Sequence, residues 1–301
     1  RRSFRKQSSG AGCPKAMSAS NSAGSGSPAT STEAVASVAA AAIAWLIFML
    51  PHSVVTVSIA TAYFTRMSQH AAAKDMAKFK TDLTTGLRVI ALVSVISTAV
   101  LIILSYPIAR VFAGEYPATV ALGNVVAAFM IGLVPFSFVY MMQRAFFALE
   151  DTRTPFVFTS IQIAIHITGS LILGATVEKQ WLVVSIALLT AFSVTIQGII
   201  AYLLLKRRIG GLEGFGVGRS LMLFILAMLP AAFIGVVVLD QLGGITEGSY
   251  PLDRVVTAVA SGILVGLAML LIYLGLLWLF KAPELREVTK QLRARFGRKS
   301  K

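Results

Sequence analysis

Long apolar runs constrain the fold of this chain more than any other feature. From Val35 onward, about seven continuous runs of roughly 18 to 25 residues each match the length of a helix that crosses about 30 Å of hydrocarbon. Short connections favour antiparallel neighbours in a bundle, and the runs lack the alternation of membrane strands. The sequence therefore predicts an all-α, polytopic membrane bundle with helices near 39–65, 86–109, 120–143, 155–176, 181–205, 220–240 and 255–280.

The composition separates this chain from soluble globular and nucleic-acid-binding proteins. Its 301 residues are 56% apolar and 13% charged, whereas an ordinary globular domain is about 25% charged. The net charge of +14 comes from cations between the apolar runs and at the chain ends, where membrane proteins carry them, and no basic stripe is interleaved with aromatic residues. The single cysteine, Cys13, excludes an internal disulfide and a cysteine-built metal site.

Three segments differ in composition. Residues 1–34 are rich in Ser, Gly, Ala and Pro, so we expect a disordered or artefactual N-terminal segment. Residues 35–281 hold the transmembrane bundle. Residues 282–301 form a basic amphipathic tail whose cations lie against anionic head groups. The apolar face of this tail carries Leu285, Val288, Leu292 and Phe296.

Lys and Arg are distributed unequally over the two sets of connections. Because basic loops stay in the cytoplasm, the asymmetry places one set and the C-terminus in the cytoplasm and starts the first span outside. Such a start indicates the second part of a longer protein. The basic set holds Arg66, Lys74, Lys78, Lys80, Arg144, Arg153, Lys206, Arg207, Arg208 and Arg219, and the opposite set holds Arg110, Lys179 and Arg254.

A polar stripe lies within the first apolar run, after Pro51. His52, Ser53, Thr56, Ser58 and Thr61 recur at helical spacing, so they predict one polar wall on an otherwise apolar helix. A lipid-facing helix has no use for such a wall, and a hydrated cavity is the functional interpretation. For His52, the alternative is a helix-start residue at the outer surface of the membrane.

The connection after the third run carries balanced charges. Arg144, Glu150, Asp151 and Arg153 lie close together before Pro155, which suits the first turn of the next helix. One interpretation is a solvated ionic staple between two spans. The other is a cytoplasmic gate whose ion pairs exchange as the bundle moves.

Two motifs, taken together, resemble a known transporter family. The first runs from Leu50-Pro51-His52-Ser53 through Ser58-Ile59-Ala60-Thr61-Ala62 to Arg66-Met67-Ser68, and the second from Arg144-Ala145-Phe146-Phe147-Ala148 to Asp151-Thr152-Arg153-Thr154-Pro155. At this spacing both are similar to the lipid II flippase family MurJ, also called MviN, in an actinobacterial form. That family belongs to the multidrug/oligosaccharidyl-lipid/polysaccharide exporter superfamily, whose members have two bundles facing a central cavity.

The resemblance implies a chain of about fourteen spans, of which this sequence holds the C-terminal half and lacks the N-terminal bundle, its expected partner. It also implies a substrate, the lipid-linked peptidoglycan precursor lipid II. Alternating access would flip it from the cytoplasmic to the outer leaflet of a bacterial plasma membrane. Two alternatives stay open: export of another polyprenyl-linked glycan, and a non-transporting half-length partner of a cell-wall assembly complex.

Further residues are assigned to the cavity by the same resemblance. Gln162, His166 and Ser170 form a polar face on the helix after Pro155, and relatives often carry Asn at the last two positions. A hydrogen-bonded structural role is the alternative for His166. Relatives commonly carry an Arg where this chain has Leu46, so the main anion-binding residues are expected in the missing half. We expect no Asp or Glu deep in a span, which leaves the driving force to the membrane potential, an ion site elsewhere or that half.

The last two apolar runs suit the polyprenyl tail of such a substrate. Pro230 predicts a kink in its helix, and Gly235, Gly262 and Gly266 belong to ladders of small residues that permit close helix contact. Ordinary packing of the bundle is the alternative. The runs contain no nucleophile with its base, paired carboxylates or metal-binding cluster, so we expect neither an enzyme nor a cofactor or metal.

Overall fold

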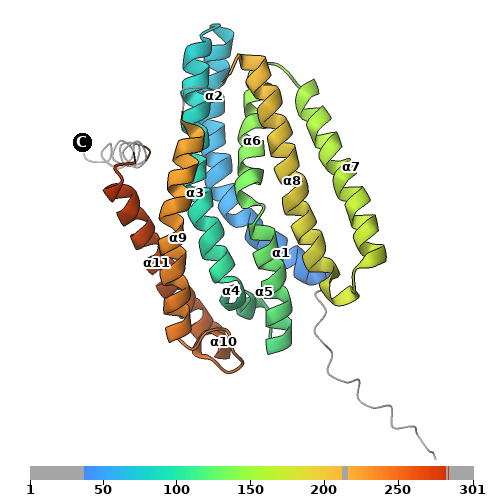
Figure 1. The fold of residues 1–301 in the computed structure, drawn as a ribbon, viewed down its shortest axis with the longest axis vertical. Helices are drawn as coiled ribbons and strands as arrows, with labels where there is room; N and C mark the ends of the chain where they lie inside the picture. Colours follow the sequence, from blue (N-terminus) through green and yellow to red (C-terminus); the bar gives the residue numbers. More distant parts are fainter. Residues whose placement is uncertain (1–36, 212–215, 283, 285–301) are drawn as a thin grey trace, which may run out of the picture. The chain divides into compact units, whose positions relative to one another are not determined.

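The described part of the chain consists of helices (Figure 1). A computed structural model describes residues 37–211, 216–282 and 284, and all regular secondary structure in these ranges is helical. Six helices are long and apolar enough to cross a membrane, and a bent pair gives a seventh crossing if it forms one span. The predicted polytopic bundle is confirmed. Its elements are α1 (Val38–Pro51), a short π-helix η1 (His52–Val57), α2 (Ser58–Ala72), α3 (Met76–Ile103), α4 (Ser105–Phe112), α5 (Tyr116–Met130), α6 (Leu133–Ala148), α7 (Arg153–Thr176), α8 (Lys179–Ile209), α9 (Val217–Gln241), α10 (Tyr250–Asp253) and α11 (Val255–Leu279).

Two of the segments predicted from composition fall largely outside the described residues. Residues 1–34 lie outside them entirely, and Ala282 and Glu284 are the described residues of the basic tail 282–301. The disorder of the first segment and the amphipathic helix of the second therefore stay predictions.

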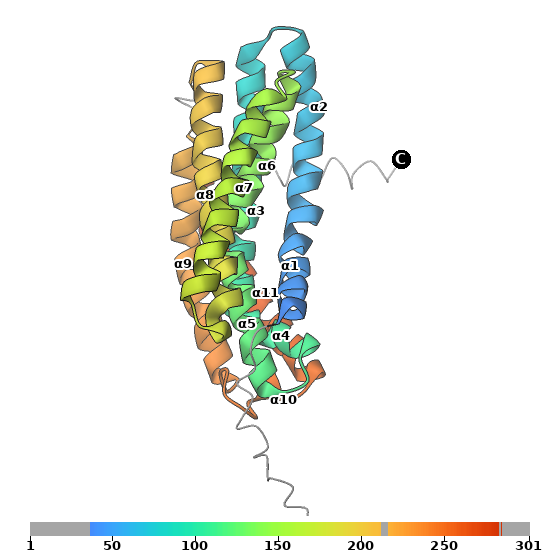
Figure 2. The same ribbon diagram turned by 90° about the vertical axis from the view of Figure 1, so that its right-hand side faces the viewer.

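The first span is longer than its apolar run. α1, η1 and α2 follow one another over 35 residues from Val38 to Ala72. Figure 2 shows them as one continuous helix, and Figure 1 shows that α1 leans away from α2. Ser37 caps its start, where the hydroxyl accepts a hydrogen bond from the Ala40 N–H at 3.2 Å. Pro51 therefore lies inside the helix. Because proline lacks an N–H and crowds the preceding turn, the wider π-helical turn of η1 accommodates it.

The second span begins earlier than the sequence predicts. α3 starts at Met76, whereas its apolar run begins near residue 86. The Asp75 carboxylate caps the helix by accepting a hydrogen bond from the Lys78 N–H at 3.1 Å. Hydropathy marks only the part of a helix inside the hydrocarbon, so charged turns beyond it are missed. As a result, Asp82 lies on a long helix and not in a connection.

The third span is bent. α5 and α6 meet at 42° across a break at Ile131 and Gly132. A Cβ added to Gly132 would lie 3.1 Å from the Cα of Ala191 on α8, so the missing side chain lets the bend approach α8 closely. Pro135 follows in the first turn of α6, where its missing N–H costs no helical hydrogen bond. The apolar run alone does not reveal this break.

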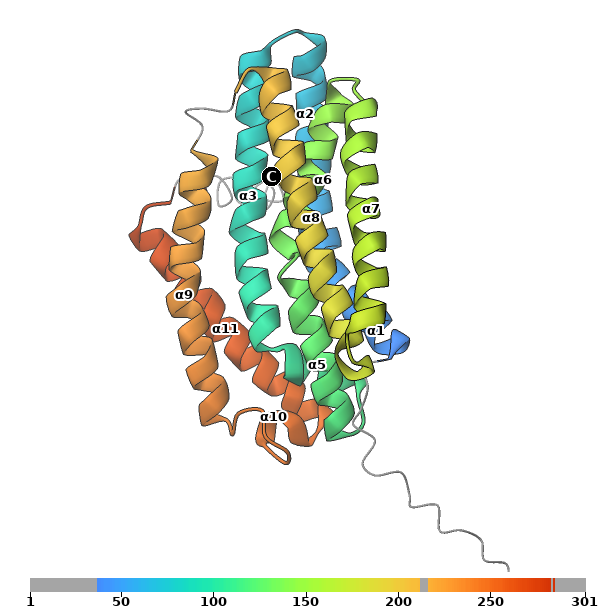
Figure 3. The same cartoon turned by 45° about the vertical axis from the view of Figure 1, so that its right-hand side comes forward.

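α3 and α6 form the centre of the described bundle. α3 packs against α2, α6 and α9, and α6 packs against α2, α3 and α8. α7 lies at one edge and packs mainly on α8, while α9 and α11 pair at the opposite edge, as Figures 1 and 3 show. Burial is highest at the centre and low at the edge: 56% of the residues in the most apolar stretch of α3 are buried, but only 6% of those in the most apolar stretch of α7. Most of the α7 surface is left uncovered by the described helices.

The basic connections lie at one end of this bundle. The turn between α2 and α3, the ends of α6 and α8 and the start of α7 lie together at the top of Figure 1. We call this the basic end, because Arg66, Lys74, Arg144 and Lys206 lie there. Beside it, one buried apolar cluster joins α2, α3, α6, α7 and α8 and is built around Phe79, Phe146 and Phe158.

Candidate functional site

His52 belongs to a buried polar cluster between the first and third spans. Its Nδ1 lies 3.5 Å from the Oγ of Ser137 on α6, and Thr56 Oγ1 donates a hydrogen bond to the same oxygen at 3.1 Å. The imidazole packs against the rings of Phe136 and Tyr140, at centroid distances of 4.5 and 5.2 Å. The three polar side chains are at most 4% exposed. In a membrane such groups need partners inside the protein, and they supply them to one another.

His52 lies far from the start of its helix. The 14 residues of α1 separate it from the helix start at Val38, a distance of about 20 Å at 1.5 Å per residue. The alternative interpretation, a helix-start residue at the membrane surface, is therefore wrong. It depended on placing the beginning of the helix at Pro51.

The polar stripe after Pro51 divides between two faces. His52 and Thr56 are buried against α6, whereas Ser53, Ser58 and Thr61 are exposed. The exposed hydroxyls donate to backbone carbonyls of the preceding turn, at 3.2, 2.7 and 2.7 Å. The predicted single polar wall is wrong, because at about 100° per residue positions 58 and 61 lie nearly opposite positions 52 and 56.

Gln162 lies in a polar seam between α7 and α8. Its Nε2 donates to the Oγ of Ser193 at 3.3 Å. His166 and Ser170, farther along α7, are half-buried. The His166 Nδ1 is buried and has no hydrogen-bond partner among the described residues. Within this part of the chain, that nitrogen forms no hydrogen bond that would support a structural role. The cavity-facing role of His166 stays a prediction.

The charged connection between α6 and α7 forms a helix cap. Asp151 accepts hydrogen bonds from the N–H groups of Arg153 and Thr154, at 3.1 and 3.0 Å, and from the Thr154 hydroxyl at 2.8 Å. These donors, chiefly the Thr154 N–H, hold the pKa of the Asp151 carboxyl below its ordinary value. Glu150 and Arg153 are exposed, and within the described ranges no ion pair joins them to Asp151 or Arg144. The predicted ionic staple is therefore not formed.

Arg144 is held by aromatic side chains. Its Nη2 donates to the hydroxyl of Tyr140 at 2.7 Å, and its guanidinium carbon lies 5.0 Å from the Tyr140 ring centroid and 5.8 Å from that of Phe64. Tyr140 also packs edge-on against His52. One tyrosine thus links the two sequence motifs, from the basic end to the buried cluster.

A buried carboxylate near the basic end is not predicted by the sequence. Asp82 on α3 is 4% exposed, with Oδ1 2.5 Å from Arg66 Nη2 and Oδ2 3.3 Å from His70 Nε2. The three residues join α2 to α3. The helix cap at Asp75 is the sequence signal that places Asp82 on this helix.

Gly262 and Gly266 line a groove. A cavity of about 500 Å³ lies between the first span, α3 and α11, and Pro51 and Val100 also line it. A Cβ at Gly262 would meet nothing within 4 Å, so this glycine leaves the groove open. We call it the Pro51 groove.

Gly235 and Pro230, predicted for the same groove, do not line it. A Cβ at Gly235 would lie 2.5 Å from the Sδ of Met269, so this glycine serves the close packing of α9 on α11. Pro230 is exposed, and α9 runs on through it to Gln241. The predicted kink therefore does not interrupt the helix.

Comparison with known protein families identifies the chain. Residues 29–280 match the family described as lipid II flippase MurJ, which covers more than half of the chain. This chain belongs to the MurJ family. MurJ membership confirms the resemblance that the two motifs carry and makes the chain a multi-pass membrane protein. The family is described as a flippase, which is a transporter and not an enzyme class.

The MurJ relatives are longer than the part they share with this chain. A probable lipid II flippase MurJ of Borreliella burgdorferi is 28% identical over 147 residues, which are 46% of this chain and 29% of the relative. Another of Rhizobium meliloti is 27% identical over 131 residues, 42% of this chain and 24% of the relative. A solved lipid II flippase MurJ in an inward closed conformation matches with a TM-score of 0.58 and 23% identity, over 78% of this chain and 47% of that structure. The chain thus spans about half the length of the MurJ structure, whose likeness shows the fold.

Three further polar residues contact the predicted site residues or their helices, although the sequence did not predict them. Ser137, Ser193 and Gln197 are buried on α6 and α8, and Gln197 Nε2 donates to Thr159 on α7 at 3.2 Å. Each of them is an isolated polar residue inside an apolar run. Such a residue needs a partner on another helix, and this is the sequence signal that could have identified them.

Proposed function

We propose that this chain is the C-terminal bundle of a bacterial transporter that flips lipid II from the cytoplasmic to the outer leaflet. The match of residues 29–280 to the lipid II flippase MurJ family carries this proposal. Because the chain spans about half of the matched MurJ structure, a second, N-terminal bundle completes the transporter. Two bundles that rock around a midplane cavity supply alternating access.

The Pro51 groove is our site for the polyprenyl tail. Its lining is mostly apolar, and on the α11 side Gly262 and Gly266 lie between larger apolar side chains such as Leu267. An apolar groove lets the tail stay in a hydrocarbon environment while the head group crosses the membrane. Pro230 and Gly235 act indirectly in this proposal, by shaping α9 and its contact with α11.

The exposed hydroxyls of the first span support a path for the polar head group. Ser53, Ser58 and Thr61 face outward from the described bundle, and each hydroxyl retains acceptor capacity after donating to the backbone. We infer that these residues line the hydrated cavity between the two bundles. With Leu46 in place of the arginine, the partner bundle contributes most of the cations for the pyrophosphate.

The uncovered face of α7 supports a position for the N-terminal bundle. Phe156, Ile167 and Leu171 are 72%, 55% and 71% exposed. Lipid alone would cover apolar residues, but the half-buried polar residues Gln162, His166 and Ser170 lie on the same helix. Polar groups inside a membrane need polar surroundings. We infer that the N-terminal bundle covers this helix, which places these three residues at the cavity side.

The basic end faces the cytoplasm in this proposal, as the excess of Lys and Arg supports. The gate at this end consists of Arg144, Glu150, Asp151 and Arg153. Arg144 links this gate to the rest of the bundle, because its contacts with Phe64 and Tyr140 connect α2 to α6.

Complementation tests the transport proposal. Cells depleted of their own lipid II flippase receive this chain alone, or together with the N-terminal bundle of a MurJ relative. We expect growth only with both bundles. Growth with neither overturns transport by this sequence, and growth with the chain alone overturns the two-bundle assembly. Accumulation of a different polyprenyl-linked glycan, with lipid II flipping intact, assigns the alternative cargo.

Arg144→Ala and His166→Ala test the two site residues in the assembled transporter. We expect each to slow lipid II flipping in vesicles by about ten-fold, which corresponds to about 1.4 kcal/mol on the barrier. Thr176→Ala, at an exposed position near the end of α7 and on the opposite face from Ile167, is the control and leaves the rate unchanged. If both variants flipped lipid II at the wild-type rate, Arg144 and His166 would have structural roles only.

A further inference from the structure

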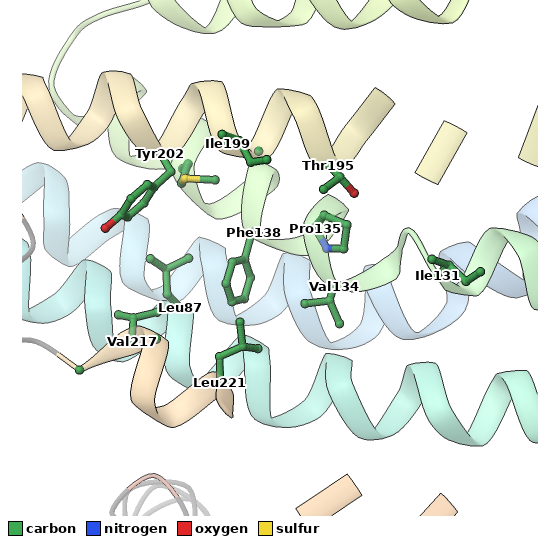
Figure 4. Close-up of a pocket in the computed structure, with 14 residues that line it drawn as sticks. Leu87, Ile131, Val134, Pro135, Phe138, Thr195, Ile199, Tyr202, Val217 and Leu221 are labelled. Carbon is green, nitrogen blue, oxygen red and sulfur yellow. The ribbon is translucent and has the colours of Figure 1, made fainter. Parts of the chain in front are cut away.

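A second apolar groove lies between α8 and α9. Its volume is about 600 Å³, and it shares no lining residue with the Pro51 groove. Leu87 on α3 and Phe138 on α6 form its floor, while Tyr202 on α8 and Leu221 on α9 form its sides. Figure 4 shows these side chains on either side of one elongated space. We call it the α8–α9 groove.

Missing side chains keep the α8–α9 groove open. Gly198 on α8 and Gly216 and Gly218 at the start of α9 all line it, and a Cβ at Gly218 would meet nothing within 4 Å. Gly216 has a left-handed φ of 61°, which glycine adopts without strain. α8 packs on α5, α6 and α7, whereas α9 packs on α3 and α11. The space between the two helices is thus left to an occupant.

The shape of the groove suits one straight hydrocarbon chain. Thr195, Ile199 and Tyr202 are exposed along one face of α8, which gives the groove a length of about 10 Å at 1.5 Å per residue. Within a bilayer, water is not available to fill an apolar groove of this kind. A fatty chain of the surrounding lipid fills it at no cost in hydration.

Cations lie at the basic end of this groove. Lys206 follows Tyr202 by one turn on the same face of α8, and it lines a neighbouring pocket of about 410 Å³ together with Arg207. The guanidinium of Arg88 lies beside the groove mouth, with Nη2 2.8 Å from the position that a Cβ on Gly216 would take. Arg88 on α3 thus lies at this end of the apolar space, and Lys206 and Arg207 follow the groove-lining part of α8 in the chain.

Glu284 is a carboxylate near Arg88. Its Oε1 is 3.9 Å from Arg88 Nε and accepts a hydrogen bond from the Ser220 hydroxyl at 2.6 Å. The separation is long for a hydrogen-bonded pair, and Arg88 Nε is buried without a hydrogen-bond partner among the described residues. Glu284 therefore positions Arg88 beside the groove.

We propose that the α8–α9 groove binds an anionic phospholipid of the bilayer, with one fatty chain between the helices and the phosphate at Lys206, Arg207 and Arg88. Basic residues beside an apolar groove are complementary to a negative head group on a fatty chain. Tyr202 lines the groove one turn before Lys206, and tyrosine is enriched at membrane–water interfaces. The proposal does not depend on the transport activity.

Spin-labelled lipids test this site. The full chain is reconstituted in phosphatidylcholine bilayers, and electron paramagnetic resonance measures how strongly spin-labelled phosphatidylglycerol and phosphatidylcholine are immobilised. We expect a preference for phosphatidylglycerol that falls by about five-fold for each cation removed in Lys206→Gln and Arg207→Gln. Gly218→Leu fills the groove and is expected to reduce the immobilised fraction of both lipids.

Gly174→Leu is the matched control. It adds the same side chain at a helical glycine of α7 where a Cβ also meets nothing within 4 Å, and we expect unchanged lipid binding. Undiminished binding in folded Gly218→Leu, or an undiminished preference in the charge variants, overturns the proposal. So does stronger displacement of the labelled phosphatidylglycerol by undecaprenyl phosphate than by unlabelled phosphatidylglycerol, because the groove would then belong to the carrier lipid.

Discussion

At the residue scale, one serine decides the surroundings of His52. The Ser137 hydroxyl serves both His52 and Thr56, which lie 85 and 81 residues away in the chain. Helical spacing relates His52 to Thr56 within one helix. This spacing does not indicate which distant helix faces the two residues. The sequence therefore predicts His52 and Thr56 as site residues but not Ser137.

Removing that hydroxyl is expected to destabilise the bundle. In Ser137→Ala, the Thr56 hydroxyl and the His52 ring lose their buried partner, so the free energy of unfolding falls by about 1 to 3 kcal/mol. Thermal unfolding in detergent micelles measures the change. Ser58→Ala is the control, because its exposed hydroxyl bonds only to its own helix, and its effect stays within about 0.5 kcal/mol. Equal losses in the two variants would contradict the role of Ser137.

At the scale of helices, the ends and bends are set by single residues. Asp75 begins α3 before its apolar run, and Asp151 caps α7 from within the charged connection. Gly132 permits the bend between α5 and α6. Hydropathy predicts that each helix exists. The residues at which a helix begins and ends depend on capping residues, which hydropathy does not indicate.

The cap at α7 makes a prediction about pH. In Asp151→Ala, we expect the free energy of unfolding to fall by about 1 kcal/mol at neutral pH, the usual effect of losing an N-cap. Because folding lowers the pKa of Asp151, this contribution is present above the ordinary carboxyl pKa of about 4 and is lost as the pH falls through the lowered value.

Unfolding in detergent at several pH values measures the effect of this cap. Glu150→Ala, an exposed neighbour, serves as the control and has little effect at any of them. A loss in Asp151→Ala that stays constant down to strongly acidic pH would contradict the ionised cap.

At the scale of the whole molecule, the bundle is asymmetric. α3 is its most buried long helix, and α7 touches chiefly α8. A helix at the edge of a membrane protein is covered by lipid or by more protein, and the proposed N-terminal bundle would cover α7.

Cysteine labelling tests that arrangement. In a Cys13→Ser background, we expect a nitroxide attached at Ile167→Cys on α7 to collide freely with oxygen dissolved in the bilayer when the chain is alone. The collision rate falls when the N-terminal bundle of a MurJ relative is present. Phe233→Cys on α9, where the native side chain is 68% exposed, is the control and gives the same collision rate in both cases. An unchanged rate at residue 167 would place the partner elsewhere.

The sequence by itself determined that this is a helical membrane protein, because apolar runs of membrane length require helices. Two short motifs were enough to indicate its family. Only the tertiary structure decided which polar residues meet. It placed Thr56 beside Ser137 and Asp82 beside Arg66, and it turned Asp151 into a cap instead of an ion-pair partner. The physical reason is that burial within one helix follows a local period, whereas the choice of facing helix depends on packing between distant segments.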